Sequence, residues 1–382
     1  MTTARRGSSW RLVAAWGGIA LLIGGCSTLH HRQARAPRTR TTVGSSASTP
    51  APPVSPESAI TSAPPGSVPR SGTSSNFGGV HVSGDQIVDG AGKRIELVGF
   101  NDSAASTCIR TGGTVFVNGM PPSGQVSLAR TWHADAVRIP LNEDCWLGIN
   151  GVPTQFATGT YQSTIVAAVS ALNSAGFYVI LDLHWNAPGG RVAKGQELMA
   201  DTDHSPAFWS SVAETFRTNS SVMFDLYNEP HGISWSCWRD GCQVPQGWHA
   251  AGMQSLVDAV RATGATQVLL LGGLGYSNDE SGWSAYEPAD PDHELAASLH
   301  VHNVDACVDA SCWTAEVGPL THVVPVVATE VGERDQGSSM VDAFIGWANT
   351  YGVGVLGWEY TRPYASALEQ DFARVLTAGA GT

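Results

Sequence analysis

The feature that most constrains the fold of this 382-residue chain is a series of short apolar segments, many of them followed by a segment with helical periodicity. Strands of a parallel sheet are buried on both faces and read as apolar runs, and amphipathic helices between them are typical of a βα fold. The clearest helices are expected at residues 161–174, 206–218, 248–262 and 340–351. Strands are expected at residues 95–100, 136–140, 178–183, 222–227, 267–271, 297–302, 324–329 and 354–358.

Eight such units predict an α/β protein with a closed (β/α)8 TIM barrel, a fold that takes about 250 residues. A doubly wound open sheet is the alternative, and it is less favoured because no glycine-rich dinucleotide-binding turn follows the first strand. Before that strand, residues 80–82 and 86–88 are apolar and alternating around Ser83-Gly84-Asp85, which predicts an N-terminal β-hairpin.

The N-terminal segment has the composition of a targeting signal. Arg5, Arg6 and Arg11 give it positive charge, and residues 12–25 form an apolar run. That run is too short to span a bilayer, which takes about 20 residues. It ends in Leu-Ile-Gly-Gly before Cys26, a pattern that resembles a bacterial lipobox, so we expect Cys26 to be lipidated. An ordinary signal peptide with an incidental cysteine is the alternative.

Three regions follow from these changes of composition. Residues 1–25 are expected to be a lipoprotein signal peptide. Residues 26–77 are rich in Ser, Thr, Pro and Ala, cannot bury enough apolar surface to offset their ordering entropy, and predict a disordered tether. Residues 78–382 are the expected catalytic domain, exported and held by lipid at the outer face of the cell membrane or envelope.

The remaining cysteines indicate disulfides. An even number of cysteines in an exported protein favours disulfide pairs over free thiols. Two pairs would each close a short loop, and the third would join the loops after strands one and two. A metal site is the alternative, but the spacings of zinc ligands are missing from the sequence. The expected pairs are Cys108 with Cys145, Cys237 with Cys242, and Cys307 with Cys312.

Polar side chains gather where the predicted strands end. In a TIM barrel the C-terminal ends of the strands carry the active site. Six strands ending in polar or aromatic residues together therefore predict one site at that face. The residues concerned are Arg138, Asn142, Glu143 and Asp144 on strand two, His184 and Trp185 on strand three, Asn228 and Glu229 on strand four, His300 and His302 on strand six, Glu330 on strand seven and Trp358 on strand eight.

Two of these residues fit the chemistry of glycoside hydrolysis. Cleaving an acetal takes one carboxylic acid to protonate the leaving oxygen and one carboxylate to handle the developing positive charge on carbon. Glu229 and Glu330 each end a long apolar run, where an ionised group is desolvated and costly unless it has a role. We therefore predict that they form the catalytic pair.

Together these motifs resemble glycoside hydrolase family 5, a cellulase-like group of retaining (β/α)8 glycosidases. The resemblance covers residues 78–382, and the few lysines indicate a member from a GC-rich, actinobacterial-type source. It rests on Val137-Arg138-Ile139-Pro140, Leu181-Asp182-Leu183-His184-Trp185, Asn228-Glu229-Pro230, His300, Glu330 and Trp358.

The resemblance implies roles for individual residues. Glu229 would be the general acid/base, and Glu330 the nucleophile of a double displacement with retention. Asn228 would bind the sugar hydroxyl beside the reacting carbon, and Arg138 would keep Glu330 ionised. The family implies no metal and no cofactor.

Further residues would bind the substrate. His184 and His300 would donate to sugar hydroxyls or orient the carboxylates, Trp185 would line the cleft, and Trp358 would lie under the sugar. His302 departs from the family's usual His-x-Tyr pattern, so we expect a histidine next to the nucleophile to influence pH dependence.

The acidic residues after strand two are open to two interpretations. Asn142, Glu143 and Asp144 are interpreted as additional substrate-binding residues, with a solvated rim as the alternative for the two acids.

The formal charge of −12 argues against a nucleic-acid partner, and we expect a monomer that acts on a polysaccharide or oligosaccharide. A β-glucan or mannan is the favoured substrate, and an exo-acting β-D-galactofuranosidase of cell-wall galactan is the alternative. A carbohydrate-binding lipoprotein without turnover is the alternative of another class.

Overall fold

The computed structural model describes residues 78–110, 114–116, 120–157, 159–335 and 337–358. The predicted signal peptide, Cys26 and the predicted tether lie outside the described residues.

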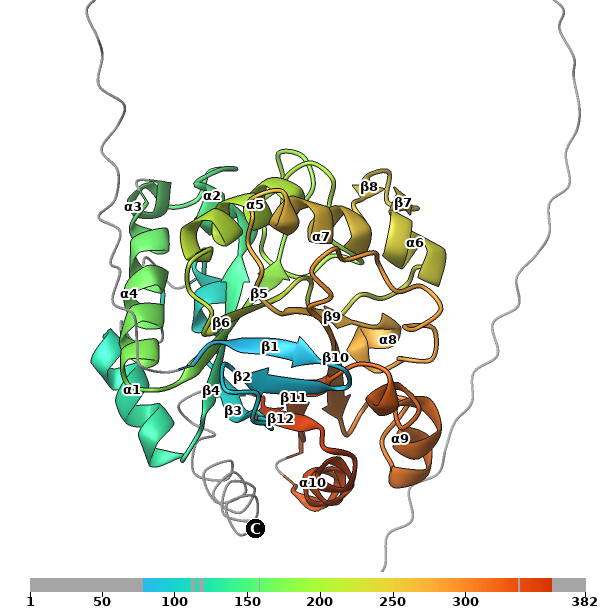
Figure 1. Ribbon diagram of the computed structural model, residues 1–382. Helices are drawn as coiled ribbons and strands as arrows, with labels where there is room; N and C mark the ends of the chain where they lie inside the picture. Colours follow the sequence, from blue (N-terminus) through green and yellow to red (C-terminus); the bar gives the residue numbers. More distant parts are fainter. Residues whose placement is uncertain (1–77, 111–113, 117–119, 158, 336, 359–382) are drawn as a thin grey trace, which may run out of the picture. The chain divides into compact units, whose positions relative to one another are not determined.

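Eight parallel strands close into a barrel in the order β10-β11-β12-β3-β4-β5-β6-β9 (Figure 1). This confirms the predicted TIM barrel, and each predicted strand corresponds to one barrel strand with shifts of a few residues at its ends. The strands are β3 (Val98–Asn101), β4 (Ala136–Asn142), β5 (Tyr178–Trp185), β6 (Val222–Asp225), β9 (Leu269–Gly272), β10 (Leu295–His302), β11 (Val326–Gly332) and β12 (Gly354–Gly357).

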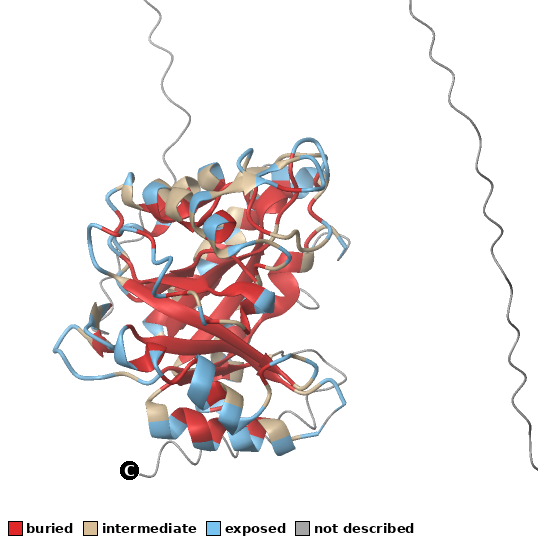
Figure 2. Cartoon of the chain, turned by 90° about the vertical axis from the view of Figure 1, so that its right-hand side faces the viewer, coloured by how far each residue is buried: buried red, intermediate tan, exposed pale blue. Residues whose placement is uncertain are grey.

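The helices lie outside the strands, and their outer faces are exposed while the strands are buried (Figure 2). They are α1 (Pro122–Thr131), α2 (Glu143–Leu147), α3 (Thr154–Ala157), α4 (Thr160–Ser174), α5 (Ser205–Phe216), α6 (Trp235–Asp240), α7 (Met253–Arg261), the distorted turn α8 (Leu274–Ser277), α9 (Ala310–Glu316) and α10 (Ser339–Tyr351), with 3₁₀ turns η1 (Ser103–Thr107) and η3 (Leu320–His322).

One predicted helix begins later than expected. The segment predicted to start at Trp248 first forms the short strand β8 (His249–Ala250), which pairs with β7 (Cys242–Gln243). Helix α7 then begins after Gly252, whose φ of 76° and close approach to Gly241 require glycine. The apolar periodicity alone does not show this break.

The N-terminal hairpin closes one end of the barrel. Strands β1 (Val80–Ser83) and β2 (Gln86–Asp89) pair antiparallel, which confirms the predicted hairpin. Its Val80 and Ile87 pack with the barrel-lining residues Leu97, Ile180 and Leu270 in one apolar cluster. A hairpin that fills this end leaves the site to the opposite end.

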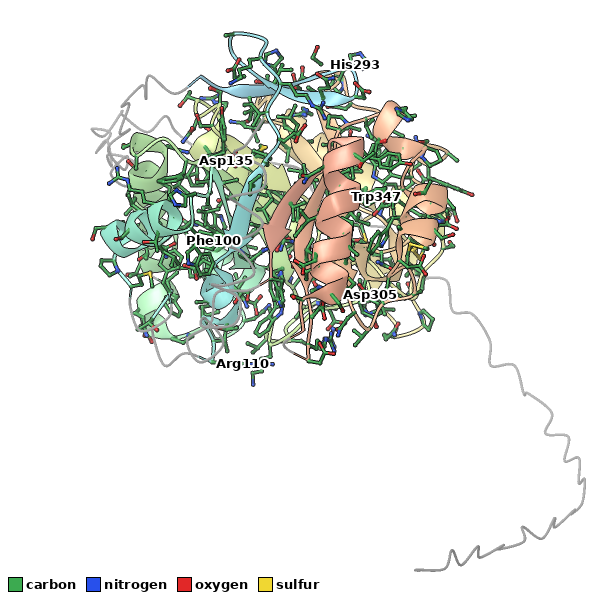
Figure 3. The ribbon with its side chains drawn as sticks, turned by 90° about the horizontal axis from the view of Figure 1, so that it is seen from below. Phe100, Arg110, Asp135, His293, Asp305 and Trp347 are labelled. Carbon is green, nitrogen blue, oxygen red and sulfur yellow. A yellow bond between two sulfur atoms is a disulfide. The ribbon has the colours of Figure 1, made fainter. Side chains whose placement is uncertain are left out.

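The two ends of the barrel are distinct in Figure 3. Asp135 and His293, which precede β4 and β10, lie toward the hairpin, whereas Arg110 and Asp305, which follow β3 and β10, lie toward the other edge. The C-terminal ends of the strands, where active sites of TIM barrels lie, therefore face away from the hairpin.

The three predicted disulfides are present. Cys108–Cys145, Cys237–Cys242 and Cys307–Cys312 are bonded, and each ties loops that follow barrel strands. Among the described residues, no helix is both long and apolar enough to cross a membrane.

Candidate active site

Glu330 lies near the end of β11 and is almost fully enclosed, with 3% of its side chain exposed. The Nη1 of Arg138 donates to Oε1 of Glu330 at 2.6 Å. The other oxygen of Glu330, Oε2, lies 3.6 Å from Nδ1 of His300 and 3.5 Å from Nε2 of His302. Burial alone would raise the pKa of Glu330, but the charges of His300 and Arg138 outweigh it and hold that pKa well below its usual range. Glu330 is therefore ionised and directed into the site.

Arg138 is the centre of a buried charge network. Its side chain is inaccessible to solvent, and its guanidinium also contacts Asp182 and Asp225, each at 3.0 Å. Asn228 accepts a further bond from its Nη2 at 3.1 Å. A buried cation is tolerated only when its donors are paired, and here three carboxylates pair with it. The predicted role of Arg138 beside Glu330 therefore agrees with the geometry.

Glu229 follows β6 in a left-handed backbone conformation, with a φ of 53°. A non-glycine residue in this region is strained, and such strain is common at functional sites. The side chain of Glu229 is 18% exposed, and its Oε1 lies 3.2 Å from Nδ1 of His300. Burial raises the pKa of Glu229, but the hydrogen bond with His300 outweighs it, and the net pKa lies below its usual value.

The two glutamates face each other closely. An oxygen of Glu229, an oxygen of Glu330 and one ring nitrogen each of His300 and His302 all lie within 4.8 Å of one another. Carboxyl groups about 5–5.5 Å apart are typical of retaining glycosidases, whereas inverting enzymes keep them about 6.5–9.5 Å apart to admit water. The spacing here fits direct attack by one carboxylate.

The same four side chains have the spacing of metal ligands. The guanidinium of Arg138, 2.6 Å from Glu330, already supplies positive charge at this place. A cation bound to Glu330 would lie close to that guanidinium and would be repelled by it. The arrangement therefore fits acid/base and nucleophilic chemistry better than metal binding.

The comparison with known families decides the assignment. The family model "Cellulase (glycosyl hydrolase family 5)" matches residues 89–362, most of the chain. The chain belongs to glycoside hydrolase family 5. The barrel is accordingly a glycosidase domain, and the match includes both strand-end glutamates.

Curated relatives of this family 5 chain are endoglucanases and a mannanase. It is 30% identical over 198 residues to the manganese dependent endoglucanase Eg5A of Phanerodontia chrysosporium, covering 50% of this chain and 47% of that protein. It is 24% identical over 304 residues to endoglucanase E-5 of Thermobifida fusca, covering 76% and 57%. It is 23% identical to the mannan endo-1,4-beta-mannosidase of Streptomyces lividans, covering 74% and 66%. The chain spans about half the length of the first relatives it matches.

Solved structures share the fold. The catalytic domain of the major endoglucanase from Xanthomonas campestris pv. campestris superposes with a TM-score of 0.62 at 17% identity, covering 79% of this chain and 100% of that one. A beta-glucanase from Saccharophagus degradans gives a TM-score of 0.61 at 18% identity, covering 79% and 94%. These likenesses support the barrel architecture of family 5.

Several other residues expected from family 5 lie at the same end of the barrel as Glu229 and Glu330. The Nδ1–H of His184 donates to Oδ2 of Asp182 at 2.8 Å, and the His184 ring stacks on Trp358 with a centroid distance of 5.3 Å, which places both rings at the same site. Trp185 lies at the same strand end, and the guanidinium of Arg110 covers its ring at 4.5 Å. His302 lies beside Glu330, and although burial opposes it, the hydrogen bond with Glu330 raises the pKa of His302.

The residues at the end of β4 and the start of α2 make their contacts inside the protein, which argues against the expected substrate-binding role and against a solvated rim. Asn142, Glu143 and Asp144 are fully buried. Asn142 caps α2, accepting from the backbone N–H of Cys145 at 3.1 Å, and Asp144 accepts from the backbone N–H of Ala193 at 2.7 Å. Because α2 begins directly at the end of β4, these side chains turn beneath the loops instead of into the cleft.

Glu143 belongs to a separate buried cluster. Ser205 donates to its Oε2 at 2.6 Å, and the second group with metal-ligand spacing is Glu143, Asp201 and His204. Burial first, and the neighbouring Asp201 second, raise the pKa of Glu143 well above its usual value. The contacts of Glu143 with Ser205 and Asp201 therefore give it a structural role between β4 and α5.

Three residues of the Arg138 network were not predicted as site residues. Asp182 and Asp225 contact the guanidinium, and Asn101 accepts from its Nη1 at 2.9 Å. Burial raises the pKa of Asp225 to about 6 in spite of Arg138. The signal was available in the sequence, because an acidic residue inside an apolar strand needs a buried partner.

Proposed function

We propose that this protein is a retaining β-glycosidase that cleaves β-linked glucan or mannan chains by double displacement. The observation that carries the mechanism is the separation of Glu229 and Glu330, whose nearest oxygens lie within 4.8 Å. That separation suits a nucleophile and an acid/base on opposite sides of one glycosidic bond and leaves no room for an inverting water.

The first displacement uses the ionised carboxylate of Glu330. Its oxygen attacks the anomeric carbon, the bond from that carbon to the leaving oxygen breaks, and the proton of Glu229 passes to the leaving oxygen. Glu229 must hold a proton at this stage, although its pKa in the free chain is low. A bound sugar covers the exposed part of this carboxyl, and the added desolvation raises its pKa.

The second displacement releases the sugar. Glu229 takes a proton from water, the water oxygen attacks the anomeric carbon, and the ester to Glu330 breaks. The negative charge of Glu330 raises the pKa of Glu229 in the free chain, and ester formation removes that charge. The pKa of Glu229 therefore falls in the intermediate, which suits its change from acid to base.

Neighbouring groups hold the pair in place. Arg138 fixes Glu330 and also donates to Oδ1 of Asn228, which orients the amide so that its nitrogen is the donor, 3.4 Å from Oε1 of Gln196. A donor fixed in this way can bind the sugar hydroxyl beside the reacting carbon as charge develops there. Trp358, stacked on His184, offers a flat surface for the same sugar.

The substrate class follows from the relatives. Endoglucanases and a mannan endo-1,4-beta-mannosidase are similar to this chain over half to three quarters of its length. The test is hydrolysis by the purified chain of a panel of β-glucans, mannans and galactan, with product size and anomer followed by NMR. Short gluco- or manno-oligosaccharides with a β anomer support the proposal, whereas single furanose units from galactan or an inverted anomer contradict it.

Two variants assign the activity to the pair. Glu229→Gln and Glu330→Gln should each lose at least about a thousandfold in kcat, because each removes a group used in the chemical steps. Glu316→Gln, on the exposed surface of α9, is the matched control and should keep full activity. Hydrolysis by both glutamine variants at the wild-type rate would show that the site lies elsewhere. A wild type that binds the glycans and hydrolyses none of them would show that the chain binds sugar without turnover.

The location of the enzyme is part of the proposal. The lipobox-like sequence before Cys26 supports an exported protein held by lipid, with the Ser/Thr/Pro/Ala-rich segment as a spacer. Labelling of cells with a fatty-acid probe should mark the wild type and not Cys26→Ala. Equal labelling of both would remove the lipid anchor from the account.

A further inference from the structure

One exposed aromatic residue next to the acid/base has no part in the mechanism above. Tyr276, in the turn after β9, is 49% exposed, an unusual state for so large a ring. Its ring stacks on the imidazole of His231 with a centroid distance of 4.2 Å and an interplanar angle of 14°. Because the imidazole covers one face and half of the residue is exposed, the other face of the ring is open to solvent.

This pair is attached to the backbone that carries Glu229. The Nδ1–H of His231 donates to the backbone oxygen of Glu229 at 2.8 Å, and Gln196 donates to the same oxygen at 3.1 Å. The backbone N–H of Tyr276 donates to the oxygen of Pro230 at 3.1 Å. Strands β6 and β9 are also neighbours in the barrel. The ring is therefore held at a fixed place relative to the acid/base.

The turn holds Tyr276 in a conformation that few side chains adopt. Gly275, Tyr276 and Ser277 are consecutive left-handed residues, with φ values of 59°, 67° and 57°. Asn278 fixes the turn, donating to the backbone oxygen of His300 at 2.9 Å and accepting from the backbone N–H of Cys307 at 2.8 Å. Non-glycine residues stay left-handed only where their surroundings impose it, and such places are common in ligand sites.

The position of the ring identifies the part of the substrate it meets. Glu229 protonates the leaving oxygen, so groups fixed around Glu229 lie beside the leaving sugar. Trp358, which lies under the sugar that becomes bound to Glu330, follows β12, and β10 and β11 separate that strand from β9. The two aromatic rings therefore serve different sugars.

We propose that the open face of Tyr276, backed by His231, is a leaving-group subsite that binds a pyranose ring by stacking. The inference rests on the proposed glycosidase function and deepens it. A pyranose with equatorial substituents presents a face of C–H groups that packs on an aromatic ring, and a rigid, half-exposed tyrosine is suited to it. The same subsite would bind an acceptor sugar once the glycosyl-enzyme has formed.

The test uses a donor that does not occupy this subsite. A disaccharide β-fluoride, of glucose or mannose units, transfers its glycosyl group to Glu330 as fluoride leaves. The resulting ester then reacts either with water or with the hydroxyl of an added disaccharide. In both reactions Glu229 takes the proton, the new C–O bond forms and the ester breaks, so their ratio reports acceptor binding and not the state of Glu229.

We expect Tyr276→Ala to lower the ratio of transfer to hydrolysis by about tenfold at subsaturating acceptor, with little change in the rate of fluoride release. Tyr276→Phe, which keeps the ring, should retain the wild-type ratio. Tyr351→Ala is the matched control, since Tyr351 stacks on Trp347 at 4.7 Å on α10, outside the site.

An unchanged ratio in Tyr276→Ala would overturn the subsite, as would a wild type that hydrolyses the fluoride without any transfer. An equal fall in Tyr276→Phe would also overturn it, because the ring would then not be the binding element. A wild type that releases no fluoride from either donor would instead contradict the proposed function, so the two failures are distinguishable.

Discussion

Replacing Arg138 should destabilise the protein in a way that depends on pH. The guanidinium is fully buried and lies 2.6 Å from Glu330 and 3.0 Å from each of Asp182 and Asp225. Arg138→Met leaves three buried carboxylates without their cation. Breaking a buried pair by removing one partner costs about 3–5 kcal/mol, so we expect the free energy of unfolding to fall by at least about that amount at neutral pH.

The pH dependence follows from the direction of the pKa shifts. In the wild type the pKa of Glu330 is lowered from 4.5, so this residue contributes stability above pH 4.5 that is lost as the pH falls through its folded value. Arg138 lowers the pKa values of Glu330 and Asp225, so without it both pKa values rise in the folded state. A carboxyl whose pKa is raised in the folded state contributes stability at low pH, and that contribution is lost as the pH rises. The difference in unfolding free energy between the wild type and Arg138→Met should therefore shrink toward acid pH.

Urea unfolding at pH 4.5 and 7.5 measures both effects. Arg217→Met is the control, because Arg217 is 39% exposed, lies 4.0 Å from Glu214, and should change stability by less than about 1 kcal/mol. A loss below about 1 kcal/mol in Arg138→Met, or a loss that is the same at both pH values, would refute the account of this network.

Three further changes test other parts of the structure. Glu143→Gln should be at least as stable as the wild type at pH 8, and its stability relative to the wild type should be greater at pH 8 than at pH 5. The raised pKa of Glu143 makes the contribution of this carboxyl to stability decline as the pH rises above 4.5. A large loss of stability of the variant at pH 8 in thermal unfolding would contradict this. His302→Tyr should extend the alkaline limb of the kcat/KM profile, because deprotonation of His302 removes its charge beside Glu330, and superimposable profiles would count against that role. The double variant Cys108→Ser/Cys145→Ser should lose about 3–4 kcal/mol of unfolding free energy, since this disulfide spans 37 residues, and a midpoint in urea equal to that of the wild type would argue against its importance.

Much of the fold was predictable because its strands are buried on both faces. Runs such as residues 178–183 and 222–227 stand out from the helices around them, and their number predicts the closed barrel. The proposed catalytic pair can be picked out from the sequence for a related reason. An ionisable residue that ends an apolar strand is costly to bury, so Glu229 and Glu330 stand out by position.

The rest depends on backbone geometry that residue types do not show. Glu143 and Asp144 also follow a strand, but α2 begins at once and turns them beneath the loops, so position at a strand end was not sufficient. Tyr276 lies in a left-handed turn without periodicity, and the proposed role for its ring depends on its stacking against His231, a residue far from it in the sequence. The periodicity places Trp248 in a helix, but the helix begins only after Gly252, because Gly252 lies too close to Gly241 for any other residue.

Trapping the covalent intermediate tests the central claim most directly. A 2-deoxy-2-fluoro disaccharide β-fluoride slows both displacements, and its good leaving group lets the ester accumulate. Mass spectrometry of the digested protein should then find one added glycosyl group on the peptide that contains Glu330, and none after Glu330→Gln. A label on Glu229 or on another carboxylate would contradict the assignment of nucleophile and acid/base. Turnover of the parent disaccharide fluoride with inversion at the anomeric carbon would contradict double displacement itself.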